Sequence, residues 1–285
     1  MTPGFVPPPR LIVVGIDAGG AEVARLVLGH GDDPATLLAV QGWEVRRVRD
    51  VVSHTVGRHV LTMVFDVRRA LVLEQPSALG QSFMAGPHPV ASLKKVVPPR
   101  WDEDLVTGEG EVPRRYQRVA AYALVTSSRG VLMTQFSDRT NAQGQWGLPG
   151  GGLEAEEAPD RAVVREVWEE SGQVVEVSEL ALVHTSHWIG RAPAGRLEDF
   201  HAVRVVYRGS CPAPTEPIVH DIGGTTASAA WVPPTDLDRL DVTANWRSLL
   251  RTLLRSAVVV APNEADSPED REQDPDADDP ARPQR

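Results

Sequence analysis

The stretch that decides the fold reads GQWGLPGGGLEAEEAPDRAVVREVWEESG from Gly144 to Gly172. Pro159 suits the first turn of a helix and Gly172 suits the position after the last turn, so the sequence predicts a helix over about 159–171, after a glycine-rich loop. At about 100° per residue, the apolar side chains and the acidic ones fall on opposite arcs of this helix. The apolar arc holds Val163, Val164, Val167 and Trp168, and the acidic arc holds Glu166, Glu169 and Glu170.

The acidic arc indicates a cation site. Like charges three and four residues apart cost a few tenths of a kcal/mol per pair, and a bound cation reverses the sign of that interaction. Carboxylate oxygens suit Mg²⁺ or Mn²⁺, which also bind substrate phosphates. Arg165 lies four residues before Glu169 and can pair with it, and the glycines 150–152 permit a close approach of the backbone to an anion or a metal. A solvated acidic helix face is the simpler interpretation of the three glutamates alone.

The full spacing favours the functional interpretation. Gly151, Glu157 and the run from Arg165 to Gly172 resemble the Nudix box, which reads Gly-x5-Glu-x7-Arg-Glu-apolar-x-Glu-Glu-x-Gly-apolar. Two positions depart from the family pattern: Gln173 replaces an apolar residue, and Glu156 replaces a turn glycine. We expect the first to weaken packing after the helix slightly and the second to reshape the loop.

The resemblance implies an α/β fold, a Nudix-type α/β/α sandwich with a mixed sheet over residues 115–258. It implies Mg²⁺-dependent hydrolysis of a nucleoside diphosphate linked to another moiety, with Mn²⁺ as an alternative ion. Carried onto matching positions, the metal would be held by Glu166, Glu169, Glu170 and the backbone near Gly151. Glu157 and Arg165 would support the metal ligands.

Nudix enzymes differ in which carboxylate acts as the general base. A box glutamate such as Glu169 or Glu166 is one choice, and a later loop is the other. The loop candidates are Glu198, Asp199, Glu216 and Asp221. Asp221 ranks first among them because the neighbouring Gly223-Gly224 suggests a loop near the site.

The rest of the chain divides into segments of different composition. Strands at 11–16, 43–52 and 59–69 and a short helix at 35–40, capped by Asp33-Pro34, predict a small α+β domain over residues 1–75. Residues 76–114 are rich in proline and predict a linker. Strands at 119–125, 131–136, 174–187, 200–207 and 230–232 and a helix at 245–256 complete the second domain. The acidic tail, residues 259–285, predicts disorder.

The composition of the chain limits the classes of binding partner and the cellular location that we expect. The formal net charge of −10 includes −6 within residues 262–285, so the body of the chain lacks the basic surface that nucleic acid polymers require. Cys211 is the single cysteine, which favours a reducing compartment. Neither a signal peptide nor an apolar run of about 20 residues is visible, so we expect a cytoplasmic protein that does not enter a membrane.

Two further features have simpler interpretations. His184 and His187 lack the second pair that a tetrahedral zinc site needs, so we expect no zinc. Trp188, Phe200 and Tyr207 could stack on a nucleobase, although aromatic residues in such strands more often belong to a core.

The sequence therefore predicts a Nudix pyrophosphohydrolase that acts on a small nucleotide. The neighbourhood of Ser186–Gly190 lacks the proline of ADP-ribose enzymes and the NADH-type signature, which leaves nucleoside triphosphates, modified nucleotides, nucleotide sugars or alcohols, and dinucleoside polyphosphates. Of these classes, the first two are favoured. The alternative is a regulator that senses a nucleotide metabolite through its N-terminal domain, whose role the sequence leaves open. A homodimer is compatible with either.

Overall fold

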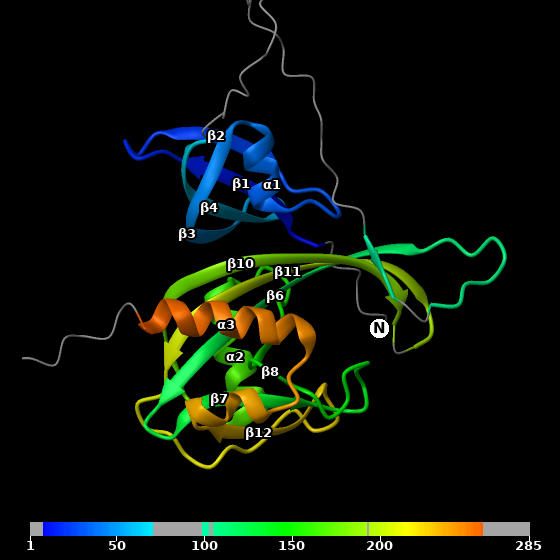
Figure 1. Cartoon of the computed structure of the whole chain (residues 1–285), viewed down its shortest axis with the longest axis vertical. Coiled ribbons are helices and arrows are strands. Elements are labelled where there is room, and N and C mark those ends of the chain that lie inside the picture. Colours follow the sequence, from blue (N-terminus) through cyan, green and yellow to red (C-terminus); the bar gives the residue numbers. More distant parts are fainter. Residues whose placement is uncertain (1–7, 71–98, 103–104, 193, 259–285) are drawn as a thin grey trace, which may run out of the picture.

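The structure is a computed structural model that describes residues 8–70, 99–102, 105–192 and 194–258. Two β-sheets are stacked, and helices cover the larger one (Figure 1). Among the described residues, no helix is long and apolar enough to cross a membrane. The mixed α/β class predicted from the sequence is confirmed.

The N-terminal unit is a four-stranded sheet with one short helix. Its elements are β1 (Arg10–Ile16), β2 (Glu22–Val27), α1 (Pro34–Val40), β3 (Trp43–Thr55) and β4 (His59–Arg69). The strand order is β2-β1-β4-β3, with β1 and β4 parallel. The predicted cap of α1 is confirmed, since Asp33 accepts a hydrogen bond from the Thr36 amide. Strand β3 extends to Thr55, beyond the predicted end at 52, because it pairs with β4 up to His59.

The second sheet follows the order β12-β7-β6-β11-β10-β5. Its long strands are β6 (Arg114–Ser127), β7 (Gly130–Phe136), β10 (Glu176–Arg191), β11 (Leu197–Ser210) and β12 (Thr226–Val232). The short strands β8 (Trp146–Gly147) and β9 (Gly150–Gly152) pair with β7 and β6, respectively. Parallel pairing of β6 with β11 makes the sheet mixed, as predicted.

Helices cover both faces of this sheet. Helix α2 (Pro159–Ser171) packs on the face that carries Val119, Ala121 and Val203. Helix α3 (Ala244–Val258), which follows the 3-10 turn η1 (Pro234–Arg239), packs on the opposite face with Leu124 and Val206. This is the α/β/α arrangement that the sequence predicted.

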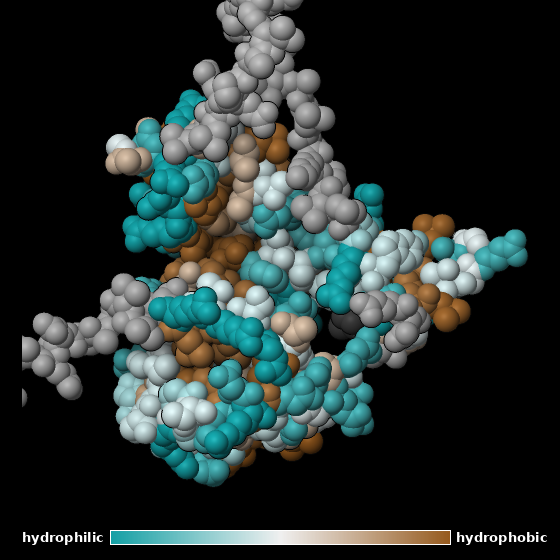
Figure 2. Space-filling view, viewed as in Figure 1, coloured by the Kyte–Doolittle hydropathy of each residue, from teal (hydrophilic) through white to brown (hydrophobic). Residues whose placement is uncertain are grey.

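The N-terminal unit shares its core with the second sheet. One continuous cluster of buried side chains runs from Leu11, Met63 and Phe65 to Val203 and Val205. Figure 1 shows the N-terminal sheet stacked on β10 and β11, and Figure 2 shows apolar side chains on both sides of this junction. Burial of apolar surface therefore holds the two units together.

The predicted linker and tail lie mostly outside the described residues. Within the predicted linker, residues 99–102 and 105–114 are described, and they include β5 (Arg100–Trp101), which pairs in parallel with Trp188 and Ile189 of β10. Part of the segment that we predicted to be a linker is thus a strand of the second sheet. The division of the chain into 1–75, 76–114, 115–258 and 259–285 stays a prediction.

Candidate active site

Helix α2 extends over the predicted residues and positions the acidic side chains. Pro159 occupies its first turn, and Gly172 ends it in the left-handed conformation, with φ 67°. The amide of Gly172 donates to the Trp168 carbonyl and closes the last turn. Between these two ends, the spacing of Glu166, Glu169 and Glu170 is fixed by the helix itself.

The predicted arcs of α2 are correct in the middle of the helix and wrong toward its end. Val163 and Val167 are buried, but Val164 and Trp168 are 39% and 50% exposed. Trp168 instead stacks on His220, with ring centroids 4.5 Å apart. Glu170, which the helical period placed on the acidic arc, is buried. Segment 218–221 lies against this end of the helix, because the amides of Ile218 and His220 donate to the carbonyls of Ser171 and Glu169.

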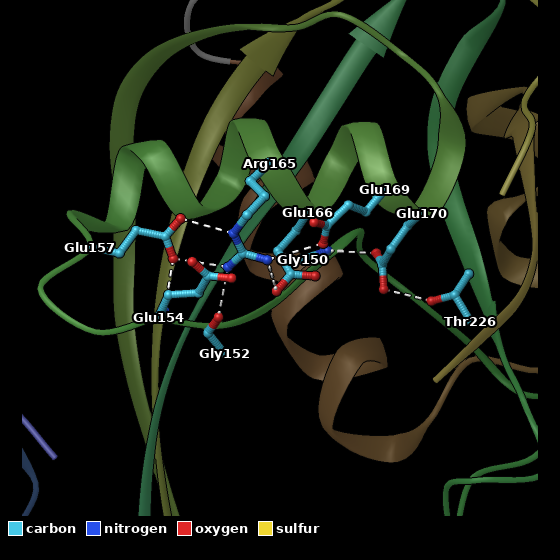
Figure 3. Close-up of polar contacts among 9 residues, drawn as sticks. All are labelled: Gly150, Gly152, Glu154, Glu157, Arg165, Glu166, Glu169, Glu170 and Thr226. Carbon is cyan, nitrogen blue, oxygen red and sulfur yellow. Dashed lines mark hydrogen bonds and ion pairs between the residues drawn. The ribbon is translucent and has the colours of Figure 1, made fainter. Parts of the chain in front are cut away.

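Arg165 lies at the centre of a hydrogen-bond network with the carboxylates of the site. Its guanidinium donates two hydrogen bonds of 2.9 Å to the carboxylate of Glu157, so this pair is bidentate. It also donates at 3.0 Å to Glu166 and to Glu169, and the second contact confirms the predicted pair. Figure 3 shows these carboxylates around the guanidinium. The hydrogen bonds from Arg165 hold the pKa of Glu157 below its ordinary value, although burial opposes that shift.

The glycine loop meets the carboxylates directly. A Cβ atom on residue 151 would lie 2.4 Å from Oε1 of Glu166, so only glycine fits there. The Gly150 amide donates to Glu170 at 2.9 Å, and the Thr226 hydroxyl donates to the other oxygen at 2.5 Å. Burial raises the pKa of Glu170 to about 7 in spite of these two hydrogen bonds.

The donor set fits a divalent cation. Three carboxylates, those of Glu157, Glu166 and Glu169, contact one arginine, and the buried carboxylate of Glu170 follows on the same helix, bound by the Gly150 amide and Thr226. Burial also raises the pKa of Glu166, against the attraction of Arg165. A second positive charge would relieve the repulsion among these groups, and hard oxygen ligands are those that Mg²⁺ prefers.

Comparison with known proteins agrees with this geometry. Residues 116–253 match the family model of the NUDIX domain. Residues 116–253 form a Nudix domain. Proteins with this domain act on substrates in which a nucleoside diphosphate is linked to another group, and the chain is a Nudix pyrophosphohydrolase.

Three similar proteins illustrate the match. A MutT-like protein from Streptomyces ambofaciens is 58% identical over 41 residues, which cover 14% of this chain and only 27% of that relative. Nucleoside triphosphatase NudI from Klebsiella pneumoniae is 29% identical over 142 residues, 47% of this chain and 94% of that protein. The solved MutT protein of Methanosarcina mazei has a TM-score of 0.40 and 22% identity, covering 50% of this chain and 96% of its own.

The four loop acids lie in different surroundings. Glu198 is buried and paired with Arg196, and Glu216 is exposed and paired with Arg129. The carboxylate of Asp199 contacts two histidines at the junction with the N-terminal sheet, on the face of β11 that carries Val203. Asp221 is the one that reaches the Nudix box: its amide donates to the Glu169 carbonyl at 3.0 Å, and its charge contributes to the raised pKa of the buried Glu170.

The two departures from the family pattern have structural partners. Glu156 occupies the left-handed region at φ 61°, the conformation for which a turn glycine is the usual residue. Gln173 is buried, where it donates to the Ser171 carbonyl and accepts from the Thr215 amide at 3.0 Å. It therefore ties the end of α2 to a later loop, which an apolar residue could not do.

Sequence reasoning missed two residues beside the box. Thr226 on β12 binds Glu170, and Arg118 on β6 lies so near the loop that a Cβ on Gly152 would be 3.0 Å from its guanidinium. Neither residue belongs to a local motif, and each reaches the site through sheet pairing. The one local indication is that Arg118 precedes the buried Val119 on a strand, so the two side chains point to opposite faces of the sheet.

A row of aromatic rings lies on the same face of the sheet as Arg118. Trp188, Phe200 and Tyr116 occupy paired positions on β10, β11 and β6. The ring centroids are 4.5 Å apart for Trp188 and Phe200 and 5.3 Å apart for Phe200 and Tyr116. Tyr116 is 45% exposed and lies two residues before Arg118, so the row ends beside the glycine loop. Tyr207, by contrast, is buried in the core.

Proposed function

We propose that this Nudix protein hydrolyses nucleoside triphosphates or modified nucleotides in a Mg²⁺-dependent reaction, with Mn²⁺ as an alternative ion. The observation that carries the proposal is the set of Glu166, Glu169 and Glu170 on one helix, around the bidentate Arg165–Glu157 pair. The similarity to the nucleoside triphosphatases NudI supports the substrate class.

Each residue has a role in this proposal. Glu166, Glu169 and Glu170 would hold the ion, together with the backbone near Gly151. The ion, when bound, neutralises the diphosphate and lowers the pKa of a bound water. Arg165 orients Glu166 and Glu169 through its hydrogen bonds. Glu169, whose side chain is 34% exposed, is the first candidate for the general base, with Asp221 as the alternative.

The aromatic row supplies a surface for the base of the nucleotide. Stacking on an aromatic ring contributes roughly 1–3 kcal/mol per base and tolerates any base. Because the row adjoins the glycine loop, a nucleotide stacked there would direct its phosphates toward the box glutamates. Arg118 lies between the two and would attract the phosphates.

The decisive experiment is a phosphate-release screen of the full chain with Mg²⁺ and with chelator. The panel contains nucleoside triphosphates, oxidised nucleotides, ADP-ribose, NADH, nucleotide sugars and dinucleoside polyphosphates. We expect metal-dependent release, greatest with one of the first two classes. Preference for another class would overturn the substrate assignment.

The site assignment is tested by Glu170→Gln. The amide keeps the size of the side chain and one acceptor oxygen, so the fold should persist, while turnover should fall at least about a hundredfold. Glu176→Gln, an exposed position at the start of β10, is the matched control and should retain full activity. Wild-type turnover in Glu170→Gln would refute the assignment.

A regulator that senses a nucleotide metabolite is the second candidate. The continuous core between the N-terminal sheet and β10 and β11 favours it, because ligand binding could be transmitted through packed side chains. Tight nucleotide binding in Mg²⁺ without product would support this function over hydrolysis.

The remaining assignments belong to the same proposal. A cytoplasmic location is supported by the single, buried, unpaired Cys211. A small nucleotide rather than a nucleic acid polymer is the expected partner, and homodimer formation can be measured by light scattering.

A further inference from the structure

Three side chains from distant parts of the chain meet at the junction of the two units. His30 follows β2, His187 lies on β10 and Asp199 lies on β11. Nε2 of His30 is 2.9 Å from Oδ1 of Asp199, and Nε2 of His187 is 2.5 Å from the same oxygen. The three side chains are only 17%, 11% and 17% exposed. One ligand atom from each lies within 4.8 Å of the others.

Strand pairing and close backbone packing position the side chains of this cluster. His187 and Asp199 point to the same face because β10 and β11 pair His187 with His201 and Ile189 with Asp199. Gly31, at φ 77°, packs so closely on His187 that a Cβ there would lie 2.7 Å from its Nδ1. The loop that carries His30 is thus in close contact with the imidazole of His187.

A third imidazole packs close to the cluster. His201 is fully buried, with its ring centroid 5.6 Å from that of His30 and 5.9 Å from that of His187. Its Nε2 has no hydrogen-bond partner, while its Nδ1 lies 2.8 Å from the Gln117 amide. Because the amide nitrogen of Gln117 donates to Nδ1, Nε2 carries the ring proton, and His201 lies beside the cluster without offering it a free lone pair.

The chemistry of the cluster differs from that of the Nudix box. Two imidazole nitrogens and one carboxylate oxygen suit Zn²⁺ or a similar transition-metal ion, whereas Mg²⁺ prefers oxygen alone. We propose that His30, His187 and Asp199 bind one Zn²⁺ ion at the junction, with His201 beside it, and that this ion joins the N-terminal unit to the Nudix domain. The proposal is independent of the activity of the box.

This site departs from our sequence-based expectation of no zinc. His184 and His187 do not form a pair, because residues three apart on a strand point to opposite faces. The partners of His187 come instead from residues 30 and 199, which the sequence does not bring together.

The test measures zinc binding by the full chain, purified in chelator and dialysed against Zn²⁺ in excess Mg²⁺. We expect one Zn²⁺ per chain in the wild type and a rise in Tm on binding. Asp199→Asn keeps an acceptor oxygen for both imidazoles and should therefore fold normally, but its zinc affinity should fall at least about tenfold. His30→Gln should show the same loss.

Two controls separate this site from others. His54→Gln removes an exposed histidine of β3 and should bind zinc as the wild type does. Glu166→Gln with Glu169→Gln disables the Nudix box and should leave zinc stoichiometry and the Tm rise unchanged. Absence of stoichiometric zinc in the wild type, or equal zinc affinity in Asp199→Asn, would overturn the proposal. Loss of zinc in the double box variant would assign the ion to the box instead.

Discussion

The carboxylate of Glu166 lies where a side chain on Gly151 would begin, with only 2.4 Å between its Oε1 and the position of a Cβ on residue 151. Because of this contact, the Glu166 side chain can occupy its position only when residue 151 is glycine. The backbone of the loop can therefore lie against the acidic face of α2, and any larger residue must push the two apart.

Gly151→Ala tests that contact. The added methyl group should displace the Glu166 carboxylate, and a displacement of about 1 Å at a catalytic group can cost about a hundredfold in rate. We expect kcat to fall between about tenfold and a hundredfold in steady-state assays. Gly108→Ala, where the nearest atom is 3.7 Å from the added Cβ, should leave kcat unchanged. Equal kcat values in both variants would contradict the prediction.

Trp188→Ala tests the aromatic row. If the row stacks on the base, its loss should raise KM between about fivefold and a hundredfold, from a stacking free energy of roughly 1–3 kcal/mol, while kcat changes little. Trp101→Ala removes a tryptophan outside the stacked row and serves as the control. A fall in kcat at constant KM would show that Trp188 does not act through substrate binding.

Glu156→Gly tests the strained loop residue. Glutamate at φ 61° carries a conformational cost of about 1–2 kcal/mol, which glycine avoids, although glycine also gains entropy in the unfolded chain. We expect a net stabilisation of about 0.5–1 kcal/mol in urea denaturation. Glu154→Gly, in the same loop but without positive φ, should destabilise. A lower free energy of unfolding in both variants would contradict the prediction.

Two buried histidines, His184 and His201, should each contribute a loss of stability in mild acid. Burial lowers the pKa of each to about 4, while the unfolded chain titrates near 6.5. Between these values the unfolded state binds more protons. The contribution of each histidine to the free energy of unfolding should therefore decrease as pH falls through this range, by up to about 1.4 kcal/mol per pH unit, whereas Glu170, with its pKa raised to about 7, contributes with the opposite sign.

The measurement is urea denaturation in chelator at several pH values between 7.5 and 4.5. His184→Gln should reduce the slope of the free energy of unfolding against pH by the contribution of one histidine. Because the buried Glu170 contributes with the opposite sign in this range, the comparison of the wild type with His184→Gln decides the prediction, and equal slopes in the two proteins would contradict it.

Local signals in the sequence predicted the parts of the site that local structure creates. Pro159 and Gly172 define the ends of α2 because they act on the backbone of their own turn, so the helix and its acidic spacing could be predicted. The box resemblance identified the glutamates and Arg165. The strand at 22–27 could not be decided, since its apolar residues follow neither period clearly.

Contacts made by the tertiary fold could not be predicted in this way. Glu170 is buried because Thr226 lies against it, 56 residues later in the chain. Trp168 is exposed on α2 because it stacks on His220 instead of entering the core. His30 and Asp199 are 169 residues apart, and no spacing rule connects them.

The shared core between the N-terminal sheet and β10 and β11 also limits how this chain can be rearranged. A Nudix domain cut from it at residue 115 would present Val203 and Val205 without their neighbours on the N-terminal sheet, and that uncovered face would invite aggregation. Recombination that exchanges whole domains between genes would therefore have to carry both units together. The N-terminal sheet and the second sheet therefore form one folding unit.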